Sequence, residues 1–166
     1  MKKLAICFAL LLLSLSANEA LGCICVLEPN LTPEKDTANR LVAFEKATAI
    51  FTGEVVSLDL LTVKFKVDKI WKGEEAKEVT MLTGTRDNGD GTFTSSSCDY
   101  HFEKGAKYLI YAYGPVGKLQ THFCSRTMLL ESAEKEMRGL DQITTHKSVS
   151  LISSRLGRRI LSEREI

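Results

Sequence analysis

Four cysteines are the residues of this chain whose spacing could do chemistry: Cys23, Cys25, Cys98 and Cys124. A single residue separates Cys23 from Cys25, so their side chains point to the same side of an extended segment. In exported proteins an even set of cysteines predicts disulfides, whereas a reducing compartment favours metal binding or catalysis. For an exported chain we expect two disulfides, and four cysteines allow three pairings.

The first 22 residues predict a secretory signal peptide. Two lysines precede an apolar run over residues 4–15, and small residues follow it. The run is shorter than the about 20 residues that a membrane-spanning helix needs, so no transmembrane segment is expected. Residues 20–22 place small side chains where a signal peptidase reads them, which puts the predicted cut between Gly22 and Cys23. We therefore expect a secreted or extracellular protein, or a periplasmic one in a bacterium, that begins at Cys23.

The composition is typical of one globular domain, with 166 residues, 44% of them hydrophobic and 26% charged. Removing residues 1–22 takes away Cys7, two lysines and Glu19, which leaves 20 basic and 20 acidic side chains. Because nucleic-acid-binding domains carry a basic excess, nucleic acid is not an expected partner. The remaining length suffices for one well-buried core.

Cleavage before Cys23 would give this residue a free α-amino group. Such a group titrates at about pH 8 and, when neutral, carries a lone pair beside the carbonyl oxygen of the same residue. The two atoms can close a five-membered chelate on a metal ion with an open position, such as catalytic zinc. That chelate displaces the zinc-bound water on which hydrolysis depends. Two disulfides at Cys23 and Cys25 would make this terminus rigid and exposed.

The pattern of polar and apolar residues predicts a domain over residues 23–140, followed by a tail over 141–166. A first helix is expected from Pro33 to about Lys46, capped by Thr32. A second helix is expected over residues 127–140. Its inward-facing side chains should be Met128, Leu129, Ala133 and Met137.

Five strands are expected between these helices, over residues 50–56, 61–71, 79–83, 108–113 and 118–123. The first should be bulged at Gly53. The second alternates apolar and polar residues and places Leu61, Val63, Phe65 and Val67 on one face. A bulge or the strand end is predicted near Lys69, and residues 84–97 are predicted to be a long polar loop.

This order predicts a mainly β protein. The economical fold is a five-stranded Greek-key barrel of the oligonucleotide/oligosaccharide-binding (OB) type with two flanking helices. The tail from Ser148 onward mixes apolar residues with arginines and is compatible with a basic amphipathic helix or with a loosely docked terminus.

Several segments share the pattern of one known family. They are Cys23-Ile24-Cys25-Val26 after the signal peptide, Phe51-Thr-Gly-Glu-Val, Val67-Asp-Lys-Ile-Trp-Lys-Gly73, Cys98 before an aromatic pair and Gly105, Tyr108-Leu-Ile-Tyr111, and Thr121-His-Phe-Cys-Ser-Arg126. Over residues 23–139 the chain resembles the inhibitory N-terminal domain of the tissue inhibitors of metalloproteinases, a netrin-like domain. It differs from the animal inhibitors at Leu27, where they carry proline, and in having no third disulfide in this domain.

The resemblance implies a partner, a zinc metalloprotease, and a role for each residue near the terminus. Cys23 would pair with Cys98, Cys25 would pair with Cys124, and Cys23 would bind the protease zinc through its amine and carbonyl. The residues implied to contact the protease are Ile24, Cys25, Val26, Ser95, Ser96 and Ser97. Ile24 would enter the first pocket beyond the scissile position, and its burial there would contribute roughly 1.5 to 3 kcal/mol.

Three alternatives remain open from the sequence. The cysteines could be structural staples of an exported netrin-like interaction module that inhibits nothing. Cys23 could carry a lipid anchor, although Leu21 lies one place too close for the usual lipobox. The cysteines could bind a metal together with His101 and His122. No phosphate loop, nucleophile elbow or zinc-protease motif occurs in the sequence, so neither catalysis nor a cofactor is expected.

Overall fold

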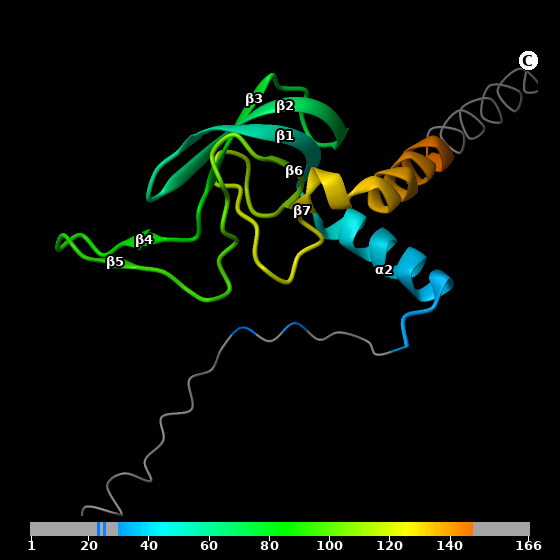
Figure 1. Cartoon of the computed structure of the whole chain (residues 1–166), viewed down its shortest axis with the longest axis horizontal. Helices are drawn as coiled ribbons and strands as arrows, with labels where there is room; N and C mark the ends of the chain where they lie inside the picture. Colours follow the sequence, from blue (N-terminus) through cyan, green and yellow to red (C-terminus); the bar gives the residue numbers. More distant parts are fainter. Residues whose placement is uncertain (1–22, 24, 26–29, 148–166) are drawn as a thin grey trace, which may run out of the picture.

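The structure is a computed structural model that describes residues 23, 25 and 30–147 (Figure 1). Predictions for residues 1–22, Ile24, Val26 and 148–166 lie outside the described residues. The elements in chain order are α2 (Pro33–Lys46), β1 (Ala49–Leu58), β2 (Thr62–Lys72), β3 (Glu78–Leu82), β4 (Arg86–Asp87), β5 (Phe93–Thr94), β6 (Lys107–Ala112), β7 (Met128–Leu129) and the 3-10 turn η1 (Leu130–Ser132). A further helix covers residues 134–147.

The fold is mainly β, as predicted, with one five-stranded antiparallel sheet in the order β3-β2-β1-β6-β7. Strands β4 and β5 form a separate hairpin that projects from the domain (Figure 1). The predicted long loop over residues 84–97 therefore contains two short strands. Among the described strands the main sheet is open, because β3 and β7 form its two edges.

The prediction of a strand over residues 118–123 is wrong. This segment forms only single bridges, in which Gln120 pairs with both Leu82 and Tyr113, and His122 pairs with Asp99. Turns on either side leave no room for a longer ladder, since Lys118 N–H bonds to Pro115 O and Ser125 N–H bonds to His122 O. Strand β7 takes the fifth place in the sheet instead.

Helix α2 begins and ends where the sequence predicts. The Thr32 hydroxyl accepts a hydrogen bond from the Lys35 N–H at 3.3 Å, and Pro33 fits the first turn because it lacks an N–H that would need a partner. Its buried residues are Asp36, Arg40 and Phe44, spaced four apart on one face. This helix therefore faces the domain with two charged side chains as well as with an aromatic ring.

Strand β2 confirms the predicted alternation, because Val63 and Phe65 are buried and the polar residue between them is not. The pairing of β1 with β2 shifts register at Asp68 and again at Trp71, so two bulges flank Lys69, near which one was predicted. Opposite them, Gly53 lies so close to β2 that a Cβ atom there would be 2.7 Å from the Lys66 carbonyl oxygen.

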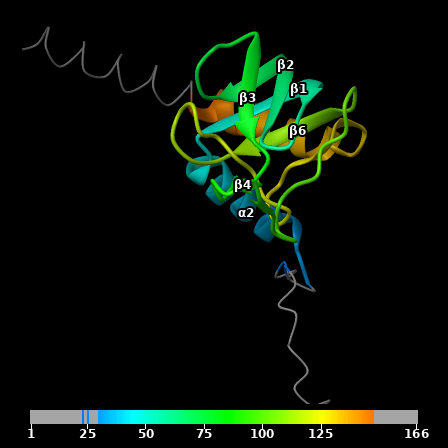
Figure 2. The same ribbon diagram turned by 90° about the vertical axis from the view of Figure 1, so that its left-hand side faces the viewer.

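The side chains of successive strand residues pack into two hydrophobic cores, one on each face of the sheet. Phe51 and Phe65 belong to one core, where the Phe65 ring meets Phe102 edge to face at 5.1 Å between ring centres. Ile50 belongs to the other core, together with Leu140. That second core lies under α2 and the helix over residues 134–147, which cover the same side of the sheet (Figure 2).

The second helix starts later than predicted. Residues 128 and 129 pair with β6 as a strand, η1 follows, and the helix covers residues 134–147. Ala133 is buried and Met128 and Met137 pack against the core, but Leu129 is 40% exposed, contrary to prediction. The reason is the period of a strand: the side chain of Met128 points toward the core, so that of Leu129 points away.

Candidate functional site

Two disulfides hold the start of the predicted mature chain against the domain. Cys23 is bonded to Cys98 and Cys25 to Cys124, the pairing that the resemblance implies. The Cα–Cα distances are 5.0 and 5.2 Å, within the usual range for disulfides. Both bridges join positions far apart in sequence, with separations of 75 and 99 residues.

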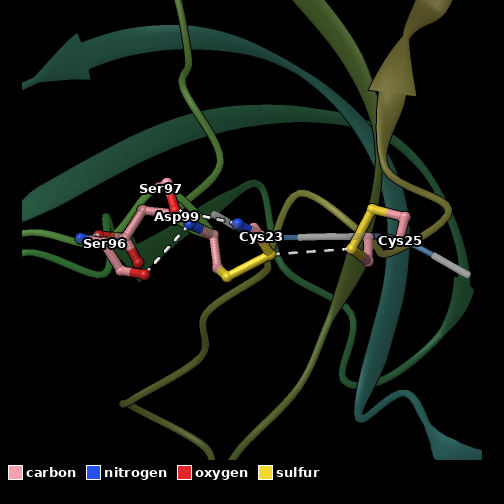
Figure 3. Close-up of a disulfide and its surroundings, with 7 residues drawn as sticks. Cys23, Cys25, Ser96, Ser97 and Asp99 are labelled. Carbon is pink, nitrogen blue, oxygen red and sulfur yellow. Dashed lines mark hydrogen bonds between the residues drawn. A yellow bond between two sulfur atoms is a disulfide. The ribbon is translucent and has the colours of Figure 1, made fainter. Parts of the chain in front are cut away.

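The backbone nitrogen of Cys23 contacts the loop before Cys98. Its N–H donates a hydrogen bond to Ser97 Oγ at 3.2 Å (Figure 3). The loop is stabilised by its own bonds: Ser96 N–H donates to an Asp99 carboxylate oxygen at 2.7 Å, and Asp99 N–H returns a bond to Ser96 O at 3.0 Å. Ser97 is thus held by short-range contacts beside the nitrogen that would become the α-amino group.

The two disulfide-bearing segments also contact each other directly. Phe123 N–H donates to Cys98 O at 2.8 Å, and Asp99 bridges to His122. The sulfur atoms of Cys23 and Cys124 lie 3.9 Å apart, although they belong to different bridges (Figure 3). Neither sulfur carries a hydrogen, so this is a van der Waals contact between the bridges.

The site forms a ridge at the surface, which we define as Cys23, Cys25, the loop over residues 95–98 and Cys124. The serines at 95, 96 and 97 and Cys124 are exposed, while Cys23, Cys25 and Cys98 are partly buried. Beside the ridge, Ser95 and Asp99 line a groove of about 190 Å³ together with Leu58, the last residue of β1, and Leu60 of the turn that follows. The structure therefore brings together every described residue that the sequence assigned to the site.

A buried charge network behind the ridge was not predicted. Arg126 donates to both oxygens of Glu136 at 2.6 Å and to Asp36 at 2.7 Å. Arg40 donates to the same two carboxylates at 3.0 and 3.1 Å, and the Tyr111 hydroxyl donates to Glu136 at 2.6 Å. Asp36, Arg40 and Glu136 are each at most 6% exposed. The network joins α2, β6, the turn after Cys124 and the helix over residues 134–147.

The network shifts the titration of its members. A hydrogen bond from Lys135, reinforced by Arg126 and Arg40, holds the pKa of Asp36 far below its ordinary value despite partial desolvation. Burial alone would raise the pKa of Glu136, but hydrogen bonds from Arg126 and Tyr111 and the nearby positive charges outweigh it, and the pKa is lowered. Burial and the bond to Glu136 raise the pKa of the Tyr111 hydroxyl. Both carboxylates are therefore ionised in the folded protein at neutral pH.

The structure does not assemble the metal site that the sequence left open. All four cysteines are in disulfides, and the His122 ring stacks on Tyr113 at 5.5 Å between centres. His101 is exposed on the segment after Cys98. Within residues 23, 25 and 30–147, no three His, Cys, Asp or Glu side chains are grouped so that they could hold a metal ion.

A second, larger groove of about 520 Å³ is lined by all five residues of β3, by residues of the turn before it, and by Val116, Gly117 and Leu119. Its apolar lining includes Val79, Met81 and Leu119, and Val116 at its rim is 70% exposed. Glu74 and Glu78 add negative charge to the lining. This groove involves none of the ridge residues.

Comparison with models of known protein families found no match, and neither did a search of curated proteins. In the part of the chain that the structure describes, no helix is long and apolar enough to cross a membrane.

Proposed function

We propose that the protein is an exported inhibitor of zinc metalloproteases, with Cys23 as its first residue after removal of residues 1–22. The α-amino nitrogen and the carbonyl oxygen of Cys23 would chelate the zinc of the protease and displace its catalytic water. The neighbouring residues and the serine loop would line the two sides of the protease cleft. No catalytic activity of the chain itself is proposed.

The observation that carries this proposal is the immobilisation of Cys23. It is bonded to Cys98, its nitrogen lies 3.2 Å from Ser97 Oγ, and Cys25 is fixed to Cys124 two residues further on. A chelating group held in place loses little freedom on binding, so more of the zinc–ligand interaction is realised as affinity. An exposed rim of serines beside a partly buried Cys23 leaves space for a protease on that side.

We further propose that the sheet belongs to a closed OB-type barrel. Leu82 N–H donates to Leu119 O, while Gln120 and Tyr113 exchange two hydrogen bonds. The short segment at residues 119–120 therefore bonds both to β3 and to the residue that follows β6, and so links two strands that are not neighbours in the sheet. The resemblance to netrin-like domains supports the same fold.

The decisive experiment changes only the chemistry of the terminus. The mature protein starting at Cys23 is compared with a variant that carries one additional alanine before it, which converts the amine into an amide. Intact mass first establishes where each chain begins and that both disulfides are present. Both chains are then titrated against a panel of zinc proteases, and we expect inhibition by the first and a loss of at least 100-fold in the second. Equal inhibition, or none by either chain, would refute the chelation mechanism.

A second arm tests the pocket contact that the resemblance assigns to Ile24. Ile24→Gly removes an aliphatic side chain whose burial contributes roughly 1.5 to 3 kcal/mol, so we expect inhibition to weaken about 10- to 100-fold. A variant that inhibits as well as the parent protein would remove this contact from the proposal.

The groove along β3 favours a second candidate function. An exported netrin-like module that inhibits no protease could use this partly apolar surface to bind another protein. Val116→Lys places a charge on the exposed rim of the groove without touching the ridge. Loss of a partner on this substitution, with the alanine-extended terminus having no effect, would favour the second function over the first.

A further inference from the structure

We propose that the two disulfides form one thiol–disulfide exchange site, in which a small monothiol converts the Cys23–Cys98 and Cys25–Cys124 bridges into a Cys23–Cys124 bridge. The proposal rests on the 3.9 Å contact between Cys23 Sγ and Cys124 Sγ. At this distance, opening one bridge is enough to start the exchange. The sulfur that is released becomes a thiolate beside the sulfur of the other bridge, which it can attack.

The exchange begins with an external thiolate, such as that of glutathione, at Cys25 Sγ. A mixed disulfide forms on Cys25, and the Cys25–Cys124 bond breaks with its electron pair on Cys124. The Cys124 thiolate then attacks Cys23 Sγ, and Cys98 leaves as a thiolate that takes up the proton lost by the incoming thiol. Two disulfides exist before and after, so the sequence consumes no oxidant or reductant.

Entry at the other bridge leads to the same Cys23–Cys124 bridge, but with the external thiol on Cys98 and the free thiol on Cys25. A thiolate that attacks Cys98 Sγ releases Cys23, which attacks Cys124 Sγ and expels Cys25. The 3.9 Å contact therefore favours the Cys23–Cys124 bridge over the other non-native pairings. Cys98 Sγ is bonded to Cys23 Sγ and Cys25 Sγ to Cys124 Sγ, so each lies one bond beyond the two sulfurs in contact.

The surroundings favour this step. Cys124 is exposed, and Cys23, Cys25 and Cys98 are only partly buried, so a small thiol can reach the site. The hydrogen bond from Phe123 N–H to Cys98 O at 2.8 Å keeps the two segments side by side during the exchange. To form the new bond the sulfurs must approach from 3.9 Å to about 2.05 Å.

The exchange would also regulate the ridge. Once Cys23 is bonded to Cys124, the loop that carries Ser97 is no longer tied to the first residue. This consequence rests on the proposed inhibition, whereas the migration of the bridge does not. The test below measures bridges alone, so its outcome is independent of whether any protease is inhibited.

Cys25→Ser releases the Cys124 thiol beside an intact Cys23–Cys98 bridge, and Cys124→Ser, the matched control, releases the Cys25 thiol. Each variant is purified at pH 4, where exchange is slow, and moved to pH 8.5, where about half of an ordinary cysteine is thiolate. Samples are acidified, alkylated and mapped, and trypsin places Cys98 and Cys124 in different peptides. In the first variant we expect alkylation to move from Cys124 to Cys98. The fraction of Cys98 that is alkylated should be at least 10-fold larger than in the control. Label that stays on Cys124, or equal labelling of Cys98 in both variants, would overturn the proposal.

The unsubstituted protein provides a second measurement if a variant fails to fold. After brief treatment with glutathione at pH 8.5, singly modified molecules are isolated, and their free thiol and remaining bridge are mapped. We expect molecules with glutathione on Cys25 to carry their free thiol on Cys98, and those with glutathione on Cys98 to carry it on Cys25. A free thiol found only on the original partner of the modified cysteine would refute the exchange.

Discussion

Arg126 and Glu136 form a two-pronged ion pair, in which Arg126 Nε donates to Glu136 Oε1 and Nη2 donates to Oε2, each at 2.6 Å. Arg126 follows Cys124 by two residues, and Glu136 belongs to the helix over residues 134–147. The pair therefore connects the ridge to the helical layer behind the sheet, through parallel hydrogen bonds that fix orientation as well as distance.

Glu136→Gln should strongly destabilise the fold. The substitution removes the charge shared by Arg126 and Arg40 and leaves two guanidinium groups facing a neutral amide in a buried site. Loss of one partner from a buried ion pair costs about 3 to 5 kcal/mol. Urea unfolding at pH 7 measures this loss. The control is Glu78→Gln, whose exposed pair with Lys64 should change stability by less than about 1 kcal/mol. Equal effects of the two substitutions would contradict the role of the network.

Stability should fall in acid because of the same carboxylates. The folded protein holds the pKa values of Asp36 and Glu136 below their ordinary values, which are about 3.9 and 4.3 in unfolded chains. Their contribution is therefore fully present above about pH 5 and decreases as the pH falls through those ordinary values, where the unfolded chain takes up protons first. Urea midpoints between pH 7 and pH 3 should show this decline. Asp36→Asn should flatten it, whereas Asp68→Asn, in an exposed pair with Lys107, should not.

Gly139→Ala should destabilise the protein, although helix propensity alone would predict stabilisation. Alanine is ordinarily better than glycine within a helix by about 1 kcal/mol. At this position, however, a Cβ atom would lie 2.5 to 2.6 Å from the Arg40 guanidinium. Arg40 would have to leave Glu136 and Asp36, so we expect a net loss of about 1 to 3 kcal/mol. Thermal unfolding decides the sign, and Gln142→Ala at an exposed position of the same helix should have little effect. A stabilised Gly139→Ala protein would mean that Arg40 has room to move.

Ser97→Ala should weaken protease inhibition about 3- to 10-fold without unfolding the protein. It removes the hydroxyl that accepts a hydrogen bond from the Cys23 nitrogen at 3.2 Å, so the chelating residue is oriented less well. A net hydrogen bond of about 1 kcal/mol corresponds to this range. Inhibition constants against a protease that the parent protein inhibits provide the measurement. Ser132→Ala, at an exposed serine of η1 outside the ridge, is the matched control, and an equal loss in both would contradict a specific role for the Ser97 hydroxyl.

Local signals were sufficient for the first half of the fold. The cap at Thr32 and the proline after it located α2, and the alternation of Val63 and Phe65 located β2 and its inner face. These features depend on residues near each other in sequence. The segment at residues 118–123 also alternates, but its length as a strand is set by turns and by partners in β3 and β6, which no local pattern reports.

The ridge could be predicted from the sequence, but the charge network behind it could not. The ridge follows from the spacing of Cys23 and Cys25 and from a resemblance that assigns their partners. The network behind it was missed because Arg126 and Glu136 look like ordinary surface residues of a polar segment. The four-residue spacing of Asp36 and Arg40 on one helix face was the only local hint of an ion pair, and nothing local indicated that it is buried.

The Cys25–Cys124 bridge also determines how a mechanical load passes through the chain. Tension applied at the two ends would run along the backbone to Cys25, cross the sulfur bridge to Cys124 and continue from there. Strands β1 to β6 lie within the bypassed segment and would remain unloaded. The force would fall first on β7, η1 and the helix over residues 134–147, whose attachment includes the clamp that Arg126 makes with Glu136. An intact bridge thus converts the domain into a shielded covalent ring. Reduction of that one bond would send the load across the Cys23–Cys98 bridge and onto β6, while β1 to β5 would remain within the segment that this second bridge bypasses.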